Sequence, residues 1–263
     1  MSPEADVLPV TDEAIAAAIG SYEREGYAEL GPVAPPAVLE GLRARADALM
    51  DGDIVYEGMF FQRDAESGDY HELPYGRGFE GPTRNYRKIE KLELDPVFTQ
   101  WMKNSVFQRI AQRVLGNDVF LLRAMMMTKP ARGGTPLPWH QDGGRFWGVD
   151  PTPRLQLWTA LDDAPFASGC VEVVPGTHHA GLATLQGGVV PAKFLAEANA
   201  EARARPLPAK AGDVLLIHNM MWHRSGVNVT DAPRRAFSVC FVDASTRCTR
   251  TRKAPRKFMR VFG

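Results

Sequence analysis

Hydrophobic residues recur with a helical period through most of the first 115 residues of the chain. Thr11 is placed to cap a first helix, which has acidic residues in its first turn and a stop signal at Gly26. The proline pair Pro35-Pro36 opens the second helix, and Pro96 opens the third. The pattern predicts helices from Thr11 to Gly26, from Pro35 to about residue 50 and from Pro96 to about Leu115, with a short strand at Tyr27–Leu30.

The segment Asp51–Arg87 has no steady period. It contains six glycines and seven aromatic residues, among them Phe61. Long irregular segments of this composition often cover binding sites. We therefore predict a lid at about residues 51–87 that closes over a substrate.

After Gly116 the pattern changes to short apolar runs separated by turns rich in glycine and proline. Several strands at this spacing predict an all-β barrel or sandwich, with the preceding helices covering one face. The chain is expected to form one domain, residues 1–263, with N-terminal helices at about 11–50, a β core at about 117–243 and a C-terminal tail at 244–263. The predicted core strands are Val119–Thr128, Arg154–Leu161, Cys170–Val174, Val214–His218 and Arg235–Val242.

Charge and cysteine content narrow the function classes. The 263 residues carry 31 basic and 31 acidic side chains, and a net charge of zero argues against nucleic acid or an anionic membrane as the main partner. No apolar run reaches the roughly 18 residues that a membrane helix needs. Three cysteines are too few for a disulfide framework, so a reducing cytoplasm is expected. We expect a monomer or a homodimer that acts on a small molecule.

The C-terminal tail has a charge of its own. From Ala244 onward it contains seven basic residues and no acidic residue. Such a run usually forms a solvated surface, here lying on an acidic part of the body or on a neighbouring subunit. A role in binding anions is the alternative.

One pair of residues has the spacing of metal ligands. His140 and Asp142 are two residues apart in a segment expected to be extended, so their side chains point the same way. A third ligand must come from elsewhere, and His218 and His223 are both available. Two histidines and one carboxylate on one face of Fe(II) leave three positions open. The pair alone is a weak signal, because a hydrogen-bonded structural pair has the same spacing.

The sequence around this pair strengthens the metal hypothesis. Several motifs follow the pair or contain it: Pro-Trp-His-Gln-Asp-Gly at 138–143, Ser-Gly-Cys at 168–170, Pro-Gly-Thr-His-His at 175–179, Gly-Asp followed by an apolar strand at 212–218, Trp-His-Arg-Ser-Gly-Val-Asn at 222–228 and Pro-Arg-Arg-Ala at 233–236. With these motifs in this order, the chain resembles the phytanoyl-CoA dioxygenase family of Fe(II)/2-oxoglutarate oxygenases from about Lys88 to Val242.

The resemblance implies a fold, cofactors and site residues. The implied fold is an all-β core with flanking helices, a double-stranded β-helix of the cupin-like, jelly-roll type. The implied metal is Fe(II), with 2-oxoglutarate and O2 as cosubstrates. The resemblance assigns His140, Asp142 and His223 as metal ligands. It places Arg234 against the distal carboxylate of 2-oxoglutarate, with Ser225 and Trp158 and, on a weaker match, Lys88 and Met125 as further cosubstrate contacts; weak candidates for substrate contact are Gln156, Phe146, Trp147 and Phe61.

Strand alternation gives an independent check on Arg234. From Arg234 to Val242, one face carries Ala236, Ser238 and Cys240 beside Arg234, all small or polar. The other face carries Arg235 and bulky apolar residues. The small residues leave room for a ligand, and arginine suits a buried carboxylate because its planar fork donates two parallel hydrogen bonds. Arg234 is therefore expected inside and Arg235 at a surface contact.

The expected activity is hydroxylation, or a related oxidation, of an unactivated C–H bond in a small organic molecule, with release of succinate and CO2. Relatives that halogenate carry Ala or Gly in place of Asp142, so this aspartate favours oxidation. The alternatives are a zinc-dependent hydrolase or isomerase on a similar barrel, which would not need Arg234, and a non-catalytic ligand-binding jelly-roll barrel. The other four histidines are expected to be mostly structural, as are the cysteines.

Overall fold

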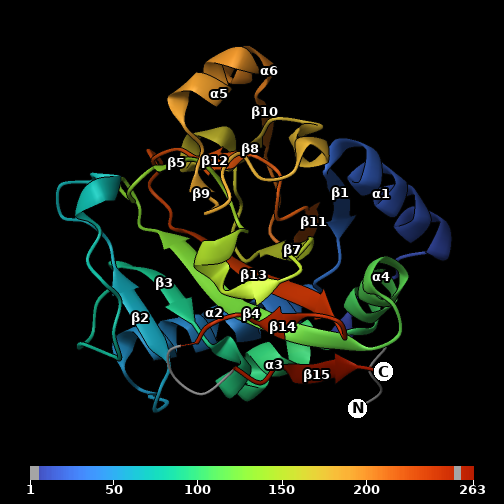
Figure 1. The fold of residues 1–263 in the computed structure, drawn as a ribbon. Coiled ribbons are helices and arrows are strands. Elements are labelled where there is room, and N and C mark those ends of the chain that lie inside the picture. The colour runs from blue at the N-terminus through green and yellow to red at the C-terminus, as the bar shows by residue number, and fades with distance from the viewer. Residues whose placement is uncertain (1–5, 252–255) are drawn as a thin grey trace.

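Two antiparallel sheets form the centre of the molecule, which the computed structural model describes over residues 6–251 and 256–263. In Figure 1 the smaller sheet, with β5, β12 and β8, lies above the larger sheet, with β13 and β4. The larger sheet has the order β1 (Tyr27–Pro32), β11 (Asp213–Ile217), β7 (Leu155–Ala160), β13 (Arg234–Asp243), β4 (Val119–Lys129), β3 (Tyr86–Glu90) and β2 (Phe60–Arg63), and β15 (Met259–Phe262) also pairs with β4. The smaller sheet has the order β10 (Arg205–Leu207), β8 (Val171–Val173), β12 (His223–Ser225), β5 (Leu137–Gln141) and β9 (Gly188–Val189).

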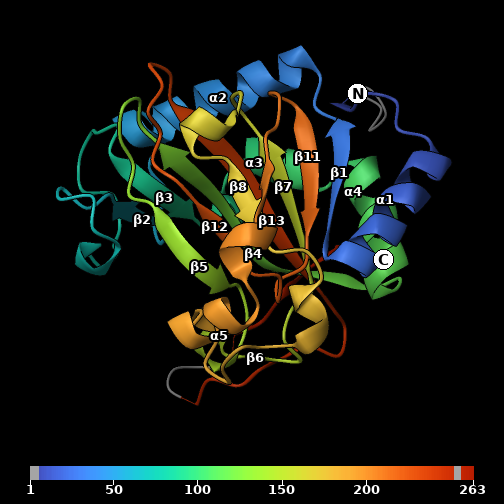
Figure 2. The same ribbon diagram turned by 90° about the horizontal axis from the view of Figure 1, so that it is seen from above.

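Helices cover the outer face of the larger sheet. The main hydrophobic core lies between them, and there the Phe98 ring stacks on Phe237 of β13 with centroids 5.4 Å apart. Trp101 donates to the hydroxyl of Thr159 on β7 at 3.1 Å. None of the helices within the described ranges is long and apolar enough to cross a membrane. The helices are α1 (Asp12–Glu25), α2 (Pro36–Asp51), α3 (Pro96–Met102) and α4 (Ser105–Leu115), with the short α5 (Ala192–Glu197) and α6 (Ala200–Arg203) beside the smaller sheet (Figure 2).

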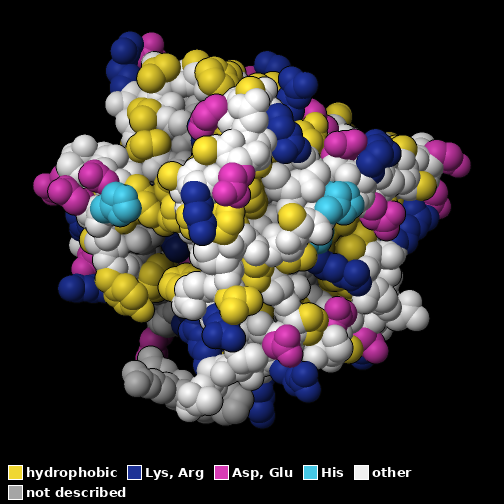
Figure 3. All heavy atoms as spheres, turned by 45° about the horizontal axis from the view of Figure 1, so that its top comes forward, with side chains coloured by type: hydrophobic (Ala, Val, Ile, Leu, Met, Phe, Trp, Pro, Cys, Tyr) yellow, Lys and Arg dark blue, Asp and Glu magenta, His cyan; other side chains and the backbone are white. Residues whose placement is uncertain are grey.

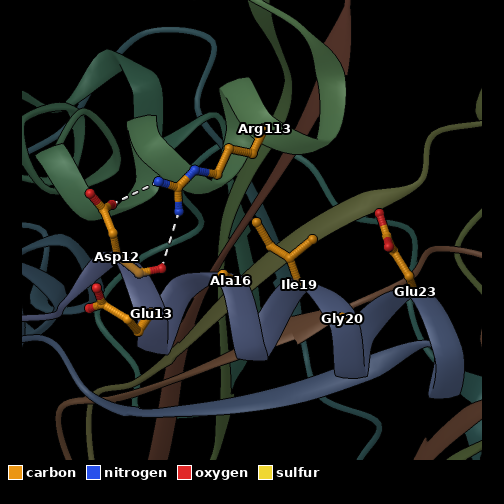
Figure 4. A pocket seen from close by; sticks show the side chains of 7 residues that line it. All are labelled: Asp12, Glu13, Ala16, Ile19, Gly20, Glu23 and Arg113. Atoms are coloured by element: carbon orange, nitrogen blue, oxygen red, sulfur yellow. Dashed lines mark hydrogen bonds and ion pairs between the residues drawn. The ribbon is translucent and has the colours of Figure 1, made fainter.

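The first two helices begin and end where the sequence predicts. The Thr11 side chain accepts a hydrogen bond from the Ala14 N–H at 3.2 Å, and Gly26 ends α1 in the left-handed conformation with φ of 84°. A shallow groove separates α1 from α4. In Figure 4, Arg113 reaches across it to Asp12, and the guanidinium donates to the Asp12 carboxylate at 2.8 Å. This contact helps to hold α1 against α4.

The single helix predicted from Pro96 to Leu115 is instead two helices. Asn104 interrupts it, because its side-chain oxygen accepts from the Phe107 N–H at 2.9 Å and so caps α4. Its amide also donates to the Trp101 carbonyl at 2.7 Å, which satisfies the end of α3. A residue that bonds to backbone groups on both sides favours a break over a continuous helix.

The two faces predicted for β13 are confirmed. Phe237, Val239 and Phe241 lie in the core under the helices, whereas Ala236 lies in a second cluster between the sheets with Trp158 of β7. Cross-strand partners share a face, so the register gives the inner residues of the neighbouring strands as well. The inner row through Ser238 contains Met125 and Trp158, and the row through Cys240 contains Arg123 and Gln156.

The segment expected to be an irregular lid and the basic C-terminal segment both contain strands. The segment predicted as a lid contains β2, which pairs with β3. The C-terminal segment contains β15 on β4 and β14 (Arg247–Cys248), which pairs with β6 (Val149–Asp150). Within its described part, this segment is therefore attached to the body as strands; residues 252–255 of the tail lie outside the described ranges.

Candidate active site

His140, Asp142 and His223 converge at one edge of the space between the sheets. His140 on β5 and His223 on β12 are direct cross-strand partners, and their ring centroids are 4.1 Å apart. Asp142 follows β5 directly; one carboxylate oxygen lies 3.9 Å from His140 Nε2 and the other lies 3.6 Å from His223 Nε2. The three side chains thus offer one donor atom each, all within 4.8 Å of one another.

Backbone carbonyls orient both imidazoles. His140 Nδ1 bonds to the Pro138 carbonyl at 2.8 Å, and His223 Nδ1 bonds to the Met221 carbonyl at 3.0 Å. A carbonyl can only accept, so each Nδ1 carries a hydrogen, and each Nε2 is turned toward Asp142. This is how metal-binding histidines are usually held.

The charges also suit a cation. Burial, followed by the nearby charge of His223, lowers the pKa of His140 to about 4, so this imidazole is neutral at pH 7. Burial acts to raise the pKa of Asp142, but the hydrogen bond and charge of His223 outweigh it and the pKa is lowered. The site therefore presents an ionised carboxylate beside a neutral imidazole.

Buried amides hold Asp142 in place. The Asp142 N–H donates to the Asn219 carbonyl at 2.8 Å, and the Asn219 amide donates back to the Asp142 carbonyl at 3.0 Å. Gln156 on β7 donates to the Asp142 carboxylate at 3.2 Å. The Gln141 side chain, next to Asp142, bonds to the neighbouring loops: its amide donates to the carbonyls of Gly181 and Met220, and its oxygen accepts from the Ala183 N–H. Sequence reasoning missed Asn219, because nothing in its local pattern marks it.

Arg234 lies inside, at the other end of the inner face. It is 3% exposed, and its guanidinium donates to the Gly169 carbonyl at 2.7 Å while Nε has no partner in the described chain. Burial lowers its pKa to about 10, so it stays charged at neutral pH. Gly169 itself has φ of 70°, and a side chain there would collide with the Gly226 carbonyl. A glycine is therefore needed where the chain approaches β12 to hold Arg234.

A second buried cation stands beside Arg234. Lys129 is its direct cross-strand partner on β4 and is 5% exposed. Its ammonium group donates to the Thr135 carbonyl at 2.8 Å, and burial, followed by the charge of Arg234, lowers its pKa to about 7. Sequence reasoning missed Lys129, although strand alternation from Met125 would have placed it on the inner face.

Unpaired polar atoms lie between these cations and the metal ligands. The indole N–H of Trp158, the hydroxyl of Ser238 and the side-chain carbonyl of Gln156 are buried without a hydrogen-bond partner in the described chain. Buried polar groups are nearly always paired in native proteins. Together with Arg234 Nε, these atoms indicate the position of a polar ligand that extends from Arg234 toward Asp142.

Most of the remaining predicted contacts lie inside the molecule, whereas Phe146 lies at its surface. Met125 and Lys88 lie on the inner face, where Lys88 pairs with Glu90 at 2.7 Å. Ser225 is buried on β12, two residues after His223. Trp147 is buried, and Phe146 beside it is exposed.

Phe61 is not at the site. It faces the helix-side core, with its ring 4.9 Å from that of Tyr86. The alternation of β2 instead puts Phe60 on the inner side, opposite Glu90.

The other histidines of the β core have structural contacts. His218 Nδ1 accepts from the Met220 N–H at 3.1 Å, and its ring lies 5.0 Å from that of His178. His178 and His179 bond to the carbonyls of Glu23 and Arg24 at the end of α1. Of the two histidines that the sequence offered as a third ligand, the geometry brings His223 to Asp142.

The residues present fit Fe(II) and 2-oxoglutarate. Two imidazoles and one carboxylate on one side are the donor set of non-haem Fe(II) oxygenases, which leaves three coordination positions open. The buried cations, Arg234 and Lys129, suit the far carboxylate of a dicarboxylic acid.

Comparisons with known proteins give the family. A model of the phytanoyl-CoA dioxygenase family matches residues 22–236. The chain is 26% identical over 255 residues to the phytanoyl-CoA dioxygenase of Arabidopsis thaliana, covering 85% of this chain and 87% of that protein. It is 23% identical over 232 residues to the peroxisomal phytanoyl-CoA dioxygenase of Homo sapiens, covering 85% and 67%.

Solved structures confirm the predicted jelly-roll fold. The epimerase SnoN, in complex with Fe3+, alpha ketoglutarate and nogalamycin RO, superposes with a TM-score of 0.72 at 18% identity, over 94% of this chain and 95% of that chain. EctD from S. alaskensis, with 2-oxoglutarate and 5-hydroxyectoine, gives a TM-score of 0.71 at 21% identity, over 94% and 84%. The family match extends over most of the sequence and includes the candidate metal ligands. The chain therefore belongs to the phytanoyl-CoA dioxygenase family and is an Fe(II)- and 2-oxoglutarate-dependent oxidoreductase.

Proposed function

We propose that this enzyme couples the oxidative decarboxylation of 2-oxoglutarate to the oxidation of an unactivated C–H bond in a small organic molecule. In the simplest case the C–H bond becomes C–OH. One atom of O2 then enters the product and the other enters succinate, and CO2 is released. The supporting observation is that the donors of His140, Asp142 and His223 converge in the same interior space that contains Arg234, a buried guanidinium whose Nε has no partner in the described chain.

The position of each side chain would determine its role in the reaction. When bound by His140, Asp142 and His223, Fe(II) supplies the oxygen chemistry. Arg234 would hold the distal carboxylate of 2-oxoglutarate with paired N–H donors, and Lys129 would add a second positive charge. Trp158 and Ser238 would donate hydrogen bonds along the cosubstrate. Gln156 would keep the Asp142 carboxylate aimed at the metal.

The site favours oxidation over the two alternatives. A zinc hydrolase would use the three ligands but would give no role to a buried arginine and lysine side by side. A non-catalytic binding barrel would not need Nε2 atoms preset for a cation by backbone hydrogen bonds. The ionised Asp142 occupies a ligand position that a halide would need, which supports oxygen transfer.

Succinate release and oxygen incorporation test the proposal. Purified protein with Fe(II), 2-oxoglutarate and isotopically labelled O2 should form labelled succinate, and candidate substrates should gain one labelled oxygen atom. The variant Asp142→Ala should lose both activities. Absence of succinate under all conditions, or a product that forms equally well with zinc, would contradict the proposal.

A further inference from the structure

Arg123 lies on the inner face of β4, in a row of residues that leads to the metal ligands. Its cross-strand partner is Cys240 on β13, and the partner of Cys240 is Gln156 on β7. Gln156 donates to the Asp142 carboxylate at 3.2 Å. Arg123 and Gln156 are two strand spacings apart, or about 10 Å between their Cα atoms. The guanidinium is therefore close to the candidate metal centre, on the side away from Arg234.

The donors of Arg123 are not used within the described chain. Its guanidinium carbon lies 4.0 Å from the Trp147 ring centroid, so it stacks on that indole. The carboxylate it approaches, Glu90, is 3.9 Å away, too far for a hydrogen bond. The side chain is nevertheless only 23% exposed. Arg235 provides a contrast, since all three of its guanidinium nitrogens donate to Asp162 or Asp47.

Arg123 shares its nearest carboxylate, Glu90, with a second cation. Lys88 and Arg123 flank Glu90. Burial acts to raise the pKa of Glu90, but the charges of Arg123 and Lys88 outweigh it and lower the pKa, so Glu90 is ionised. Two cations therefore share one carboxylate, and neither a second carboxylate nor a carbonyl in the described chain takes the N–H donors of Arg123.

Apolar side chains lie beside Trp147 and along β4. Phe146, next to Trp147 in the chain, is 67% exposed, and Leu185, whose carbonyl accepts from the Arg145 N–H, is 70% exposed. Met125 lines the inner face next to Arg123 along β4. In Figure 3, a hollow on the left, on the side of β2 and β3, is bordered by hydrophobic side chains, with a basic side chain visible inside.

We propose that Arg123 binds a carboxylate group of the substrate, and that the substrate class is a monocarboxylic acid with an apolar body. The guanidinium fork would take the carboxylate with two parallel N–H donors while Trp147 holds the fork in place. A carboxylate suits the unused N–H donors of Arg123, whereas a phosphate dianion would place a second negative charge next to Glu90. This inference rests on the proposed oxygenase function, because it names the substrate class of the same site.

Binding without turnover tests this proposal separately from oxygenation. The protein is loaded with Mn(II) and saturating 2-oxoglutarate, so that the cosubstrate position is filled. The probes are straight-chain acids from butanoate to decanoate, phenylacetate and 3-phenylpropionate, each with its primary amide, and dissociation constants are measured by ligand-observed NMR. At least one acid should bind ten times more tightly than its amide, because the amide lacks the charge and one acceptor.

Variants assign this preference to Arg123. Arg123→Gln should bind the acid and the amide equally, and Arg123→Lys should keep part of the preference. Both should bind 2-oxoglutarate as the wild type does. Arg247→Gln, which removes an exposed arginine paired with Asp150, should keep the full preference.

Three results would overturn the proposal: no acid preferred over its amide by the wild type, an unchanged preference in Arg123→Gln, or tighter binding of octyl phosphate than of octanoate. Failure of the oxygenase function would show instead as absent succinate release in the iron-loaded protein.

Discussion

Arg234 and Lys129 are direct cross-strand partners, and both are buried cations on the inner face of the larger sheet. Like charges placed directly opposite each other in a sheet are destabilising. Arg87 adds a further positive charge to Lys129, and the Asp64 carboxylate opposes it. A dicarboxylate bound between Arg234 and Lys129 would relieve this repulsion.

The affinity for 2-oxoglutarate should therefore weaken as pH rises through about 7. Burial and the Arg234 charge lower the pKa of Lys129 to about 7, so below that pH its ammonium attracts the dianion and above it the charge is lost. One linked proton changes the dissociation constant by at most about tenfold per pH unit. Calorimetric titration of the Mn(II)-loaded protein from pH 6 to 8 would measure this. Lys129→Met should flatten the profile, and Lys210→Met, at an exposed site, should not; an unchanged slope in Lys129→Met would contradict the prediction.

Arg234→Met should weaken 2-oxoglutarate binding while metal binding persists. Leaving a buried carboxylate unpaired costs roughly 2–5 kcal/mol. At about 1.4 kcal/mol per tenfold, the dissociation constant should rise roughly 30- to 4,000-fold. The same titration measures the constant.

The matched change at Arg235 should act on stability instead. The sequence predicts a surface contact for Arg235, but the structure corrects this: its guanidinium bonds to Asp162 at 2.8 and 2.9 Å and to Asp47 at 2.7 Å, and it is largely buried. Arg235→Met should lower the free energy of unfolding by about 1.5–3 kcal/mol, the contribution of a hydrogen bond between charged groups, and leave 2-oxoglutarate affinity nearly unchanged. If Arg235→Met weakened 2-oxoglutarate more than Arg234→Met, the assignment of faces on β13 would be wrong.

His223→Ala should abolish binding of one Fe(II) per chain, because it removes one of three converging donors. His218→Ala should leave metal binding largely intact, since His218 lies with His178 and bonds to the Met220 N–H. Anaerobic equilibrium dialysis with Fe(II) would compare the two variants. Equal loss of iron would refute the choice of His223 over His218.

Asn104→Ala should destabilise the protein by about 1–2 kcal/mol, since a lost N-cap costs roughly this amount and the Phe107 N–H would be left buried without its acceptor. Thr11→Ala removes the corresponding cap of α1 at an exposed position and should cost less. Urea denaturation followed by circular dichroism would compare them. Equal losses would show that the break between α3 and α4 does not depend on Asn104.

The segment at residues 51–87 is expected to close over a bound substrate. Arg77 and Arg84 in this segment are 72% and 53% exposed at the side chain, so trypsin should reach them in the free enzyme. The carboxylic acid that binds most tightly in the NMR experiment should slow cleavage at Arg77 and Arg84 but not at the exposed Arg203. Equal cleavage rates with and without that acid would argue against a lid.

Patterns that depend on neighbours along the chain could be predicted from the sequence. The cap at Thr11, the stop at Gly26 and the alternation of β13 all come from local rules, and the structure agrees with each. The convergence of His140 and Asp142 with His223 followed from motif resemblance, not from local pattern.

Features set by pairing in space could not be predicted. The strands β2, β12 and β15 have three or four residues each, and such short strands are fixed by the strand beside them. The bulge between Gln62 and Arg63 shows how little local pattern constrains β2, and Phe61, expected to contact substrate, lies in the helix-side core instead. The sequence does not indicate roles for Lys129 and Arg123. A charged residue in an apolar strand can face either solvent or an interior ligand, and the sequence alone does not distinguish the two.

The pairing of His140 with His223 also affects the order of folding. The two histidines are about 80 residues apart in the chain, and β12 must align with β5 in one register to bring them together. Closing so long a loop is entropically costly, so this contact is expected to form after the local helices and hairpins. The unfolded chain has no preformed cation site. Iron is therefore expected to bind only chains in which the smaller sheet has formed, and to stabilise those chains against unfolding by mass action.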